Sequence, residues 1–293
     1  MKRLERAALA ALACFPYLGV AQAEGIRALD DSGAEIVLRG PAQRVVTLAP
    51  HLTELVYAAG GAASLVATDR ASDYPSAVAD LQRIGDASGL DLERIVALRP
   101  DLVLGWQSGN KPSDIARLRR LGLPVFLSEP RRLGDVARTL RVLGLMLGTA
   151  RVAEERAEAF EARLHALRAR AAGLRPVSVF FEVWHQPLIT VNADHLISDV
   201  VALCGGYNAL GALPALAPAV NLESVLARDP EVILAAGLPS GALSGWSRFP
   251  GLRAVQRHQI FEIDSDSLTR ATPRVLDGAE RLCRRMEAAR DWR

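Results

Sequence analysis

The sequence predicts an α/β protein of two Rossmann-like lobes that are joined by one long, rigid α-helix. Two observations support this prediction: a stretch that occurs twice, and a long periodic segment between the two copies. The first copy, residues 91–106, reads DLERIVALRPDLVLGW, and the second, residues 221–236, reads NLESVLARDPEVILAA. The copies align without a gap, so we expect one α/β lobe around each; chance similarity between α/β units is the alternative.

Each copy has the pattern of a short helix followed by a buried strand. Asp91 or Asn221 suits the helix N-cap, because its side-chain oxygen accepts a hydrogen bond from the first turn. Pro100 or Pro230 ends the helix. The apolar run that follows is typical of a strand covered on both faces, as in a parallel sheet.

A weaker echo supports the duplication. In both halves a buried strand is followed by a Ser- or Thr-capped helix, starting at Thr53 or Ser198, and then by a glycine pair. The pairs at 60–61 and 205–206 suit the left-handed turn that ends a helix.

The other expected elements are a hairpin over 26–38, strands over 44–49, 64–68, 124–127, 177–184, 188–191 and 259–263, helices over 113–121 and 133–147, a polar loop over 264–272, and a last helix opened by Pro273.

The long periodic segment covers residues 149–173. Thr149 suits its N-cap, and apolar residues recur at helical spacing while Arg and Glu fill the other faces. At 1.5 Å per residue the helix would span about 36 Å, the diameter of a small domain. We therefore interpret it as a strut between lobes at 24–148 and 174–293, with an ordinary surface helix as the alternative.

The first 23 residues have the features of a secretory signal peptide. A basic start precedes an apolar run over 7–20, and Ala21-Gln22-Ala23 is a small-x-small cleavage site. This run is too short to span a membrane, so we expect an exported, soluble protein of the periplasm. A lipoprotein cysteine at Cys14 is the alternative.

Charge and cysteine content narrow the function classes. Residues 1–23 hold three of the 35 basic and one of the 33 acidic residues, so the remaining chain has 32 of each. Such a neutral chain lacks the basic footprint of nucleic-acid binding. Cys204 and Cys283 remain after export, and an even count in an oxidising compartment predicts one disulfide; two separate buried thiols are the alternative.

Motifs for catalysis are missing from the sequence. It contains no HExxH, GxSxG, CxxC, P-loop or GxGxxG pattern, and its five histidines are scattered without metal-ligand spacing. This favours a binding protein that is no enzyme and that carries neither a cofactor nor a metal. Polar or aromatic residues instead follow the strand ends, where open α/β sheets bind ligands.

The chain resembles the cobalamin-binding components of ABC importers, which are helical-backbone substrate-binding proteins. The resemblance covers about residues 24–290 and rests on RVVTLAPHLTEL, SDYP, LERIVALRPDLVLGW, the long helix, CGGYN, LESVLARDPEVIL and ATPR…LC. It implies two α/β lobes joined by one helix, with a ligand cleft between them. It also implies a corrinoid ligand, a membrane permease as partner, and a monomer in solution.

The resemblance assigns roles residue by residue. Glu93 and Glu223 match two glutamates, one per lobe, that dock onto arginines of the permease. Trp106 matches a tryptophan that contacts the ligand. Asp266 and Arg270 match a polar pair that reaches the ligand from the second lobe. The alternatives are a core tryptophan, ordinary first-turn glutamates and a local salt bridge.

Further residues have expected roles. Tyr74, Trp184 and His185 lie at strand ends or loops that would face the cleft, so we expect them to bind ligand; a structural role for Tyr74 and a plain polar or metal-ligating role for His185 are alternatives. Cys204 and Cys283 match the disulfide of the family.

The chain departs from the family in its aromatic lining. The family has aromatic residues where this sequence has Ala71, Ala87, Ile189 and Ala217. We therefore expect corrinoid binding that is weaker, or shifted towards a variant corrinoid. A ferric siderophore or haem receptor of the same architecture is the second hypothesis, and an exported enzyme that uses Asp266, His185 or Glu93 is the third.

Overall fold

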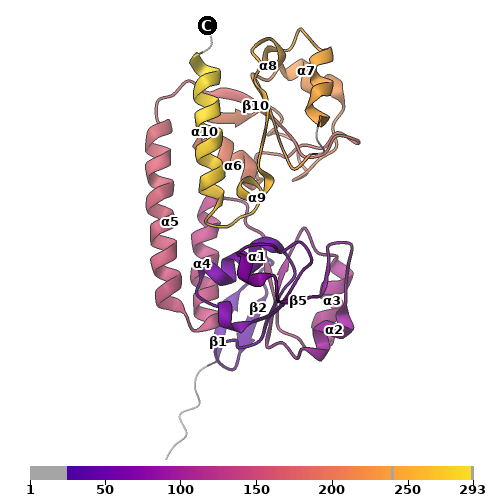
Figure 1. Cartoon of the computed structure of the whole chain (residues 1–293), viewed down its shortest axis with the longest axis vertical. Helices are drawn as coiled ribbons and strands as arrows, with labels where there is room; N and C mark the ends of the chain where they lie inside the picture. The colour runs from indigo at the N-terminus through magenta and orange to yellow at the C-terminus, as the bar shows by residue number, and fades with distance from the viewer. Residues whose placement is uncertain (1–24, 239–240, 292–293) are drawn as a thin grey trace, which may run out of the picture.

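The structure is a computed structural model that describes residues 25–238 and 241–291. The expected signal peptide and Cys14 lie outside these residues. The described chain forms two separate parallel sheets, one in each half, with strand orders β5-β4-β3-β8-β9 and β11-β10-β12-β13. The two halves lie one above the other with long helices along one side (Figure 1). This is the predicted α/β architecture of two lobes joined by a long helix.

The first lobe is built around the five-stranded sheet. The sheet consists of β3 (Val45–Thr47), β4 (Leu65–Thr68), β5 (Gln82–Arg83), β8 (Leu102–Trp106) and β9 (Val125–Ser128). Helices α1 (Pro50–Ala58), α2 (Leu92–Ala97) and α3 (Pro112–Arg120) accompany it, together with the hairpins β1–β2 (Ile26–Leu29, Glu35–Leu38) and β6–β7 (Gly85–Asp86, Gly89–Leu90). The expected hairpin over 26–38 is confirmed.

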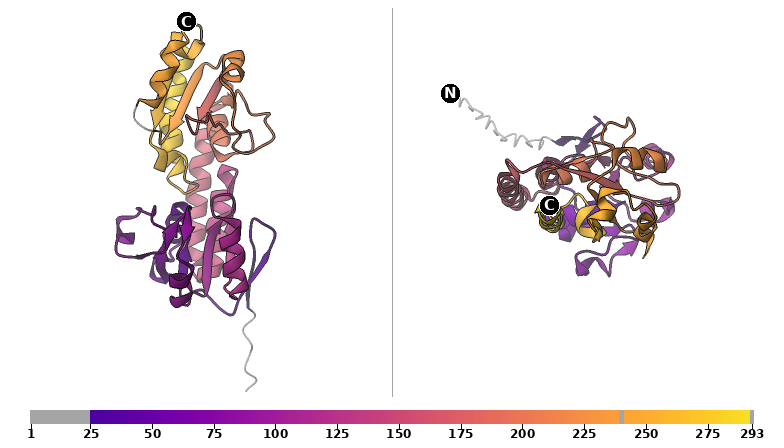
Figure 2. Two further views of the ribbon diagram at one scale, coloured as in Figure 1. Left: turned by 90° about the vertical axis from the view of Figure 1, so that its right-hand side faces the viewer. Right: turned by 90° about the horizontal axis from the view of Figure 1, so that it is seen from above.

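The second lobe repeats this plan with four strands. They are β10 (Val177–Glu182), β11 (Gly206–Asn208), β12 (Val232–Ala236) and β13 (Ile260–Ile263). The helices are α6 (Leu196–Leu203), α7 (Leu222–Arg228), α8 (Arg253–Gln256), α9 (Ser265–Leu268) and α10 (Val275–Asp291). The lobes lie at opposite ends of the molecule when it is turned by a quarter (Figure 2).

The sequence repeat corresponds to a structural repeat. Asp91 and Asn221 are the N-caps of α2 and α7, and each side chain accepts a backbone N–H at 2.9 Å. After the prolines, β8 and β12 run at equivalent central positions of the two sheets. The apolar run of each strand is fully buried. The predicted helix–Pro–strand unit is therefore confirmed in both copies.

The prediction that Thr53 and Ser198 are helix N-caps was wrong. Helix α1 begins at Pro50, whose fixed φ and missing N–H suit the first helical position. Thr53 is buried instead, and its hydroxyl is within 2.6 Å of those of Thr47 and Thr68. The N-cap of α6 is His195 rather than Ser198, because the His195 ring accepts the cap hydrogen bond.

Four smaller expectations also need correction. Residues 188–191 form only isolated bridges, through Ile189, rather than a strand. The polar loop over 264–272 contains the short helix α9, and the last helix begins at Val275, two residues after Pro273. Thr149 precedes the long helix, but its side chain makes no cap hydrogen bond.

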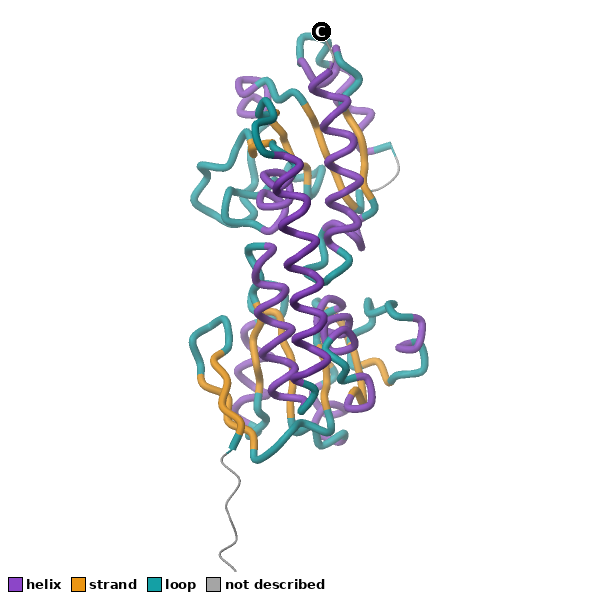
Figure 3. Tube along the Cα trace, turned by 90° about the vertical axis from the view of Figure 1, so that its left-hand side faces the viewer, coloured by secondary structure: helices purple, strands orange, loops and turns teal. Residues whose placement is uncertain are grey.

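The long helix α5 (Ala150–Ala171) connects the two lobes, as predicted, and α4 (Leu133–Leu147) packs along it. Helix α4 turns back at Gly148, whose φ of 70° is left-handed, into α5. A Cβ on Gly144 would lie 2.3 Å from the Cβ of Ala153, so the two helices approach closely there. The two helices run side by side, and α5 continues to the second lobe (Figure 3).

Helix α5 contacts both lobes through one buried stripe. The stripe consists of Ala153, Ala157, Phe160, Leu164 and Leu167, spaced alternately by four and three residues. These side chains belong to one continuous core that also includes the inner faces of both sheets. Ion pairs add to this packing, from Arg141 of α4 to Glu154 and from Arg163 to Asp277 of α10. Helix α5 is therefore packed along its length, which gives the predicted strut its rigidity.

Candidate functional site

A cleft of about 400 Å³ lies between the two lobes. Its walls are the carboxyl ends of parallel strands from both sheets, which is the usual ligand site of open α/β sheets. The first lobe contributes Pro50, His51, Trp106, Ser108, Glu129, Pro130 and Arg131. The second lobe contributes Phe181, Val183, Val191, His195, Leu196, Ile197, Leu216, Ala217, Ala236, Thr269, Arg270 and Ala271. The cleft is thus mostly apolar, with a few polar groups from each side.

Trp106 lies at the end of β8 and lines the cleft with 37% of its surface exposed. The turn after the strand holds its backbone, since Asn110 accepts the Trp106 N–H at 2.7 Å and donates to Leu48 O. A Cβ on Gly109 would lie 1.9 Å from the indole, so this turn needs glycine to let the ring lie over it. The structure brings Trp106 to the cleft, as expected.

His51 lies beside Trp106 with the two rings edge to face, at a centroid distance of 5.4 Å. Burial, with a further contribution from the charge of Arg270, lowers the pKa of His51 to about 4. The ring is therefore neutral at pH 7. Its Nε2 is buried without a hydrogen-bond partner in the described part of the chain.

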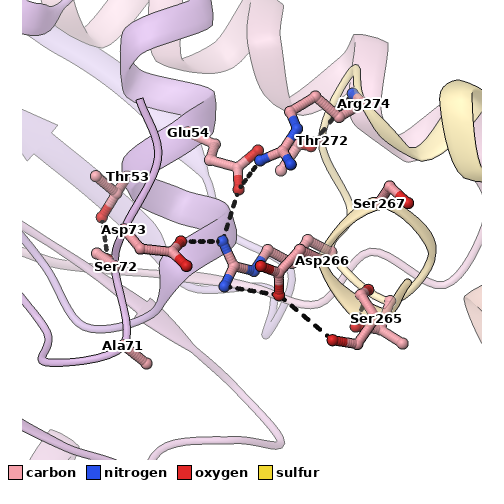
Figure 4. A network of polar contacts seen from close by, with 12 residues as sticks. Thr53, Glu54, Ala71, Ser72, Asp73, Ser265, Asp266, Ser267, Thr272 and Arg274 are labelled. Carbon is pink, nitrogen blue, oxygen red and sulfur yellow. Dashed lines mark hydrogen bonds and ion pairs between the residues drawn. The ribbon is translucent and has the colours of Figure 1, made fainter. Parts of the chain in front are cut away.

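Arg270 connects the two lobes at one side of the cleft. Its guanidinium lies 3.0 Å from the Glu54 carboxylate on α1 and 2.6 Å from Asp73, both in the first lobe. It also pairs with Asp266 one helical turn away, at 3.0 Å. Figure 4 shows these acidic groups around the arginine. Arg270 lines the cleft. Asp266 orients the Arg270 guanidinium, but Asp266 itself is not part of the cleft lining.

Arg274 strengthens this inter-lobe network. It bonds the same Glu54 oxygen at 3.1 Å, and its guanidinium lies 3.9 Å from the ring centroid of Tyr74. Arg270 donates a hydrogen bond to the Asp73 carboxylate and so lowers the pKa of Asp73, which keeps this carboxylate ionised at pH 7. Tyr74 thus takes part in the contact between the lobes and does not line the cleft.

Trp184 and His185 follow β10 but lie outside the cleft lining. His185 Nδ1 is 2.7 Å from the buried Glu182 carboxylate, whose other oxygen accepts the Trp246 indole N–H at 2.6 Å. Trp184 is 52% exposed, and its indole donates to Gln186 O. Ligand-binding roles for these two residues and for Tyr74 stay predictions.

Several site residues escaped the sequence analysis. His195 and Arg131 line the cleft, and Glu54, Asp73 and Arg274 build the network that joins the lobes. Arg131 follows β9, so the strand-end rule that selected Trp106 also applied to it. No local pattern marks Glu54, because its partners lie more than 200 positions away.

Glu93 and Glu223 are exposed in the first turns of α2 and α7. In Figure 1 these two helices lie on the side of each lobe away from α5. Neither carboxylate has a hydrogen bond or ion pair within residues 25–238 and 241–291. Their geometry leaves both free for a partner, and docking stays a prediction.

The cysteines form the expected disulfide. Cys204 at the end of α6 is bonded to Cys283 of α10.

Within the described ranges, no group of three or more His, Cys, Asp or Glu side chains is placed to hold a metal ion. The helices described are also too short or too polar to cross a membrane.

Comparisons with known proteins agree with this architecture. The chain is 35% identical over 252 residues to the vitamin B12-binding protein of Vibrio cholerae, covering 85% of this chain and 91% of the relative. The crystal structure of the periplasmic vitamin B12 binding protein of Vibrio cholerae matches with a TM-score of 0.79 and 34% identity, over 86% of this chain and 99% of that one. A periplasmic haem-binding protein from Roseiflexus matches with a TM-score of 0.75 and 26% identity, over 85% and 99%.

These relatives are binding proteins, which agrees with the prediction that the chain is no enzyme. The family model described as "Periplasmic binding protein" matches residues 45–267, from the first buried strand to helix α9. It thus spans both sheets, the helix pair between them and most of the cleft. The chain belongs to the periplasmic binding protein family.

Proposed function

We propose that this protein captures cobalamin or a related corrinoid in the periplasm and delivers it to the permease of an ABC importer. The observation that carries the proposal is the cleft between the lobes, with Trp106 exposed on one wall and Arg270 on the other. The similarity to vitamin B12-binding proteins supports the ligand class. On this proposal the mature chain begins at Glu24, is a monomer, and has lobes over 24–148 and 174–293.

The chemistry of the cleft fits a corrinoid. A flat corrin ring offers an apolar face to Trp106, and its amide side chains offer partners to polar groups at the rim. Cobalamin is larger than a cleft of about 400 Å³, so binding separates the lobes or leaves part of the ligand in solvent. Separation would act against the bonds of Arg270 and Arg274 to the first lobe.

A haem or ferric siderophore is the second candidate. The structural similarity to a haem-binding protein favours it, and so does the loss of aromatic lining at Ala217, which lies in the cleft wall. Calorimetric titration with cobalamin, cobinamide, haemin and a ferric siderophore separates the candidates. Binding of haemin or siderophore, with no response to either corrinoid, would overturn the corrinoid proposal.

Trp106→Ala is expected to weaken corrinoid binding by at least about 2 kcal/mol, because a well-placed aromatic anchor commonly dominates such a site. Calorimetry of the variant and the unchanged protein with the same corrinoid measures the difference. Tyr207→Ala is the control, since this exposed aromatic residue of β11 lies outside the cleft lining and has no predicted role in binding. A larger loss in the control than in Trp106→Ala would contradict the assignment of Trp106.

Replacing both Glu93 and Glu223 by alanine is expected to weaken binding to the permease and transport, while ligand affinity in solution stays nearly unchanged. Two carboxylates, one per lobe, can meet arginines that are related by permease symmetry. Because rim charges mainly set encounter rate and salt dependence, the effect should diminish at high salt. Binding to permease in membranes and ligand titration are measured together; an equal fall in ligand affinity would refute the docking role.

A further inference from the structure

A group of hydrogen bonds joins the two lobes next to the cleft. Arg132, just before α4, donates to Ala193 O and to the Asp194 carboxylate of the second lobe, each at 3.1 Å. The backbone N–H of Leu133 donates to Asp199 on α6 at 2.7 Å. These bonds hold the segment after β9 against the segment before α6. Arg131 and His195, which belong to these two segments, both line the cleft.

Arg131 presents a positive charge to the cleft. Its backbone N–H donates to Asp135, but its exposed guanidinium has no hydrogen bond or ion pair among the described residues. Arg132 and Arg270 differ, since each is bonded to carboxylates of the protein. The carboxylate of Glu129, which also lines the cleft, accepts both hydrogen bonds of Ser108, at 2.9 and 3.0 Å.

His195 adds a hydrogen-bond donor next to this charge. Its Nδ1 accepts the backbone N–H of Ile197 at 3.1 Å as the N-cap of α6, so in the neutral ring the proton lies on Nε2. Burial and the charge of Arg131 lower the pKa of His195 to about 4. The ring is therefore neutral at pH 7 and offers Nε2–H as a donor.

A guanidinium beside an imidazole N–H is suited to an anionic oxygen group, because charge-assisted hydrogen bonds to such oxygens are the strong ones. We propose that Arg131 and His195 form an anion subsite of the cleft that binds an oxyanion of the ligand, which in cobalamin is the phosphodiester of the nucleotide loop. This inference rests on the proposed function. Cobinamide has the same corrin ring without that phosphodiester, and haemin carries carboxylates instead.

The test is calorimetric titration of the full mature chain with cobalamin, cobinamide and haemin. Arg131→Gln should weaken cobalamin binding about ten-fold or more, the usual worth of a hydrogen bond to a charged group. The affinity of Arg131→Gln for cobinamide should stay within about two-fold of that of the unchanged protein. Arg131→Lys should retain part of the preference for cobalamin, because it keeps the charge but not the fork geometry. His195→Asn, which keeps an acceptor for the helix cap, should also lower cobalamin affinity selectively.

Arg120→Gln is the control, because it removes an exposed arginine from α3, which does not line the cleft. Equal losses for cobalamin and cobinamide in Arg131→Gln, or no loss for either, would overturn the anion subsite. If the unchanged protein binds neither corrinoid, the proposed function fails separately. In that case the haemin titration decides. A loss of haemin affinity in Arg131→Gln but not in Arg120→Gln supports an anion subsite that binds a haemin carboxylate. An unchanged haemin affinity in Arg131→Gln overturns the anion subsite.

Discussion

Replacing Cys204 and Cys283 together by alanine is expected to lower the free energy of unfolding by about 4.5 kcal/mol. The disulfide joins residues 79 positions apart, and in the chain-entropy model a cross-link of that span removes much of the freedom of the unfolded chain. It also ties the end of α6 to α10, a helix that packs against α6. Urea unfolding of the variant and the oxidised protein, at equal ionic strength, measures the loss.

Reduction of the unchanged protein is the control for this experiment. Dithiothreitol breaks the cross-link and leaves both sulfur atoms in place, so it separates the constraint on the unfolded chain from the packing of the buried Cys204. We expect the reduced protein to lose most of the same stability. A loss below about 1 kcal/mol in both samples would contradict the chain-entropy argument for this disulfide.

Replacing Glu54 by alanine is expected to cost about 3–5 kcal/mol of stability, the usual cost of removing one partner from a buried ion pair. The Glu54 side chain is only 3% exposed, and one of its oxygens serves both Arg270 and Arg274. Without it two partly buried guanidinium groups face the first lobe with Asp73 as the nearest remaining acid. Because these arginines belong to the second lobe, the lobes should also separate more readily.

Asp266→Ala is the matched control, since Asp266 pairs with the same arginine but lies within the second lobe and is 38% exposed. Exposed pairs are worth at most about 1 kcal/mol, so a much smaller loss is expected. Urea unfolding gives the stability, and small-angle scattering of the ligand-free variant gives the separation of the lobes. Equal losses for Glu54→Ala and Asp266→Ala would show that the inter-lobe contact has no special weight.

Local patterns in the sequence determined the repeated unit, the long helix and the lobe plan. These features are the N-caps at Asp91 and Asn221, the prolines after each short helix and the apolar strands. Each depends only on interactions between residues that are close in the sequence. The same holds for Trp106, whose position follows from the end of a buried strand. Compartment and cysteine count were enough to predict the disulfide.

Tertiary structure alone decided how the lobes meet. The partners of Arg270 lie 216 and 197 positions before it, and no periodicity links residues at such a distance. The sequence pattern also could not show that α4 packs against α5. Their close contact depends on two small residues, Gly144 and Ala153, which do not stand out in a hydrophobic periodicity. Which residues line the cleft was decided in the same way, because only the packing of two separate sheets brings Arg131 and His195 together.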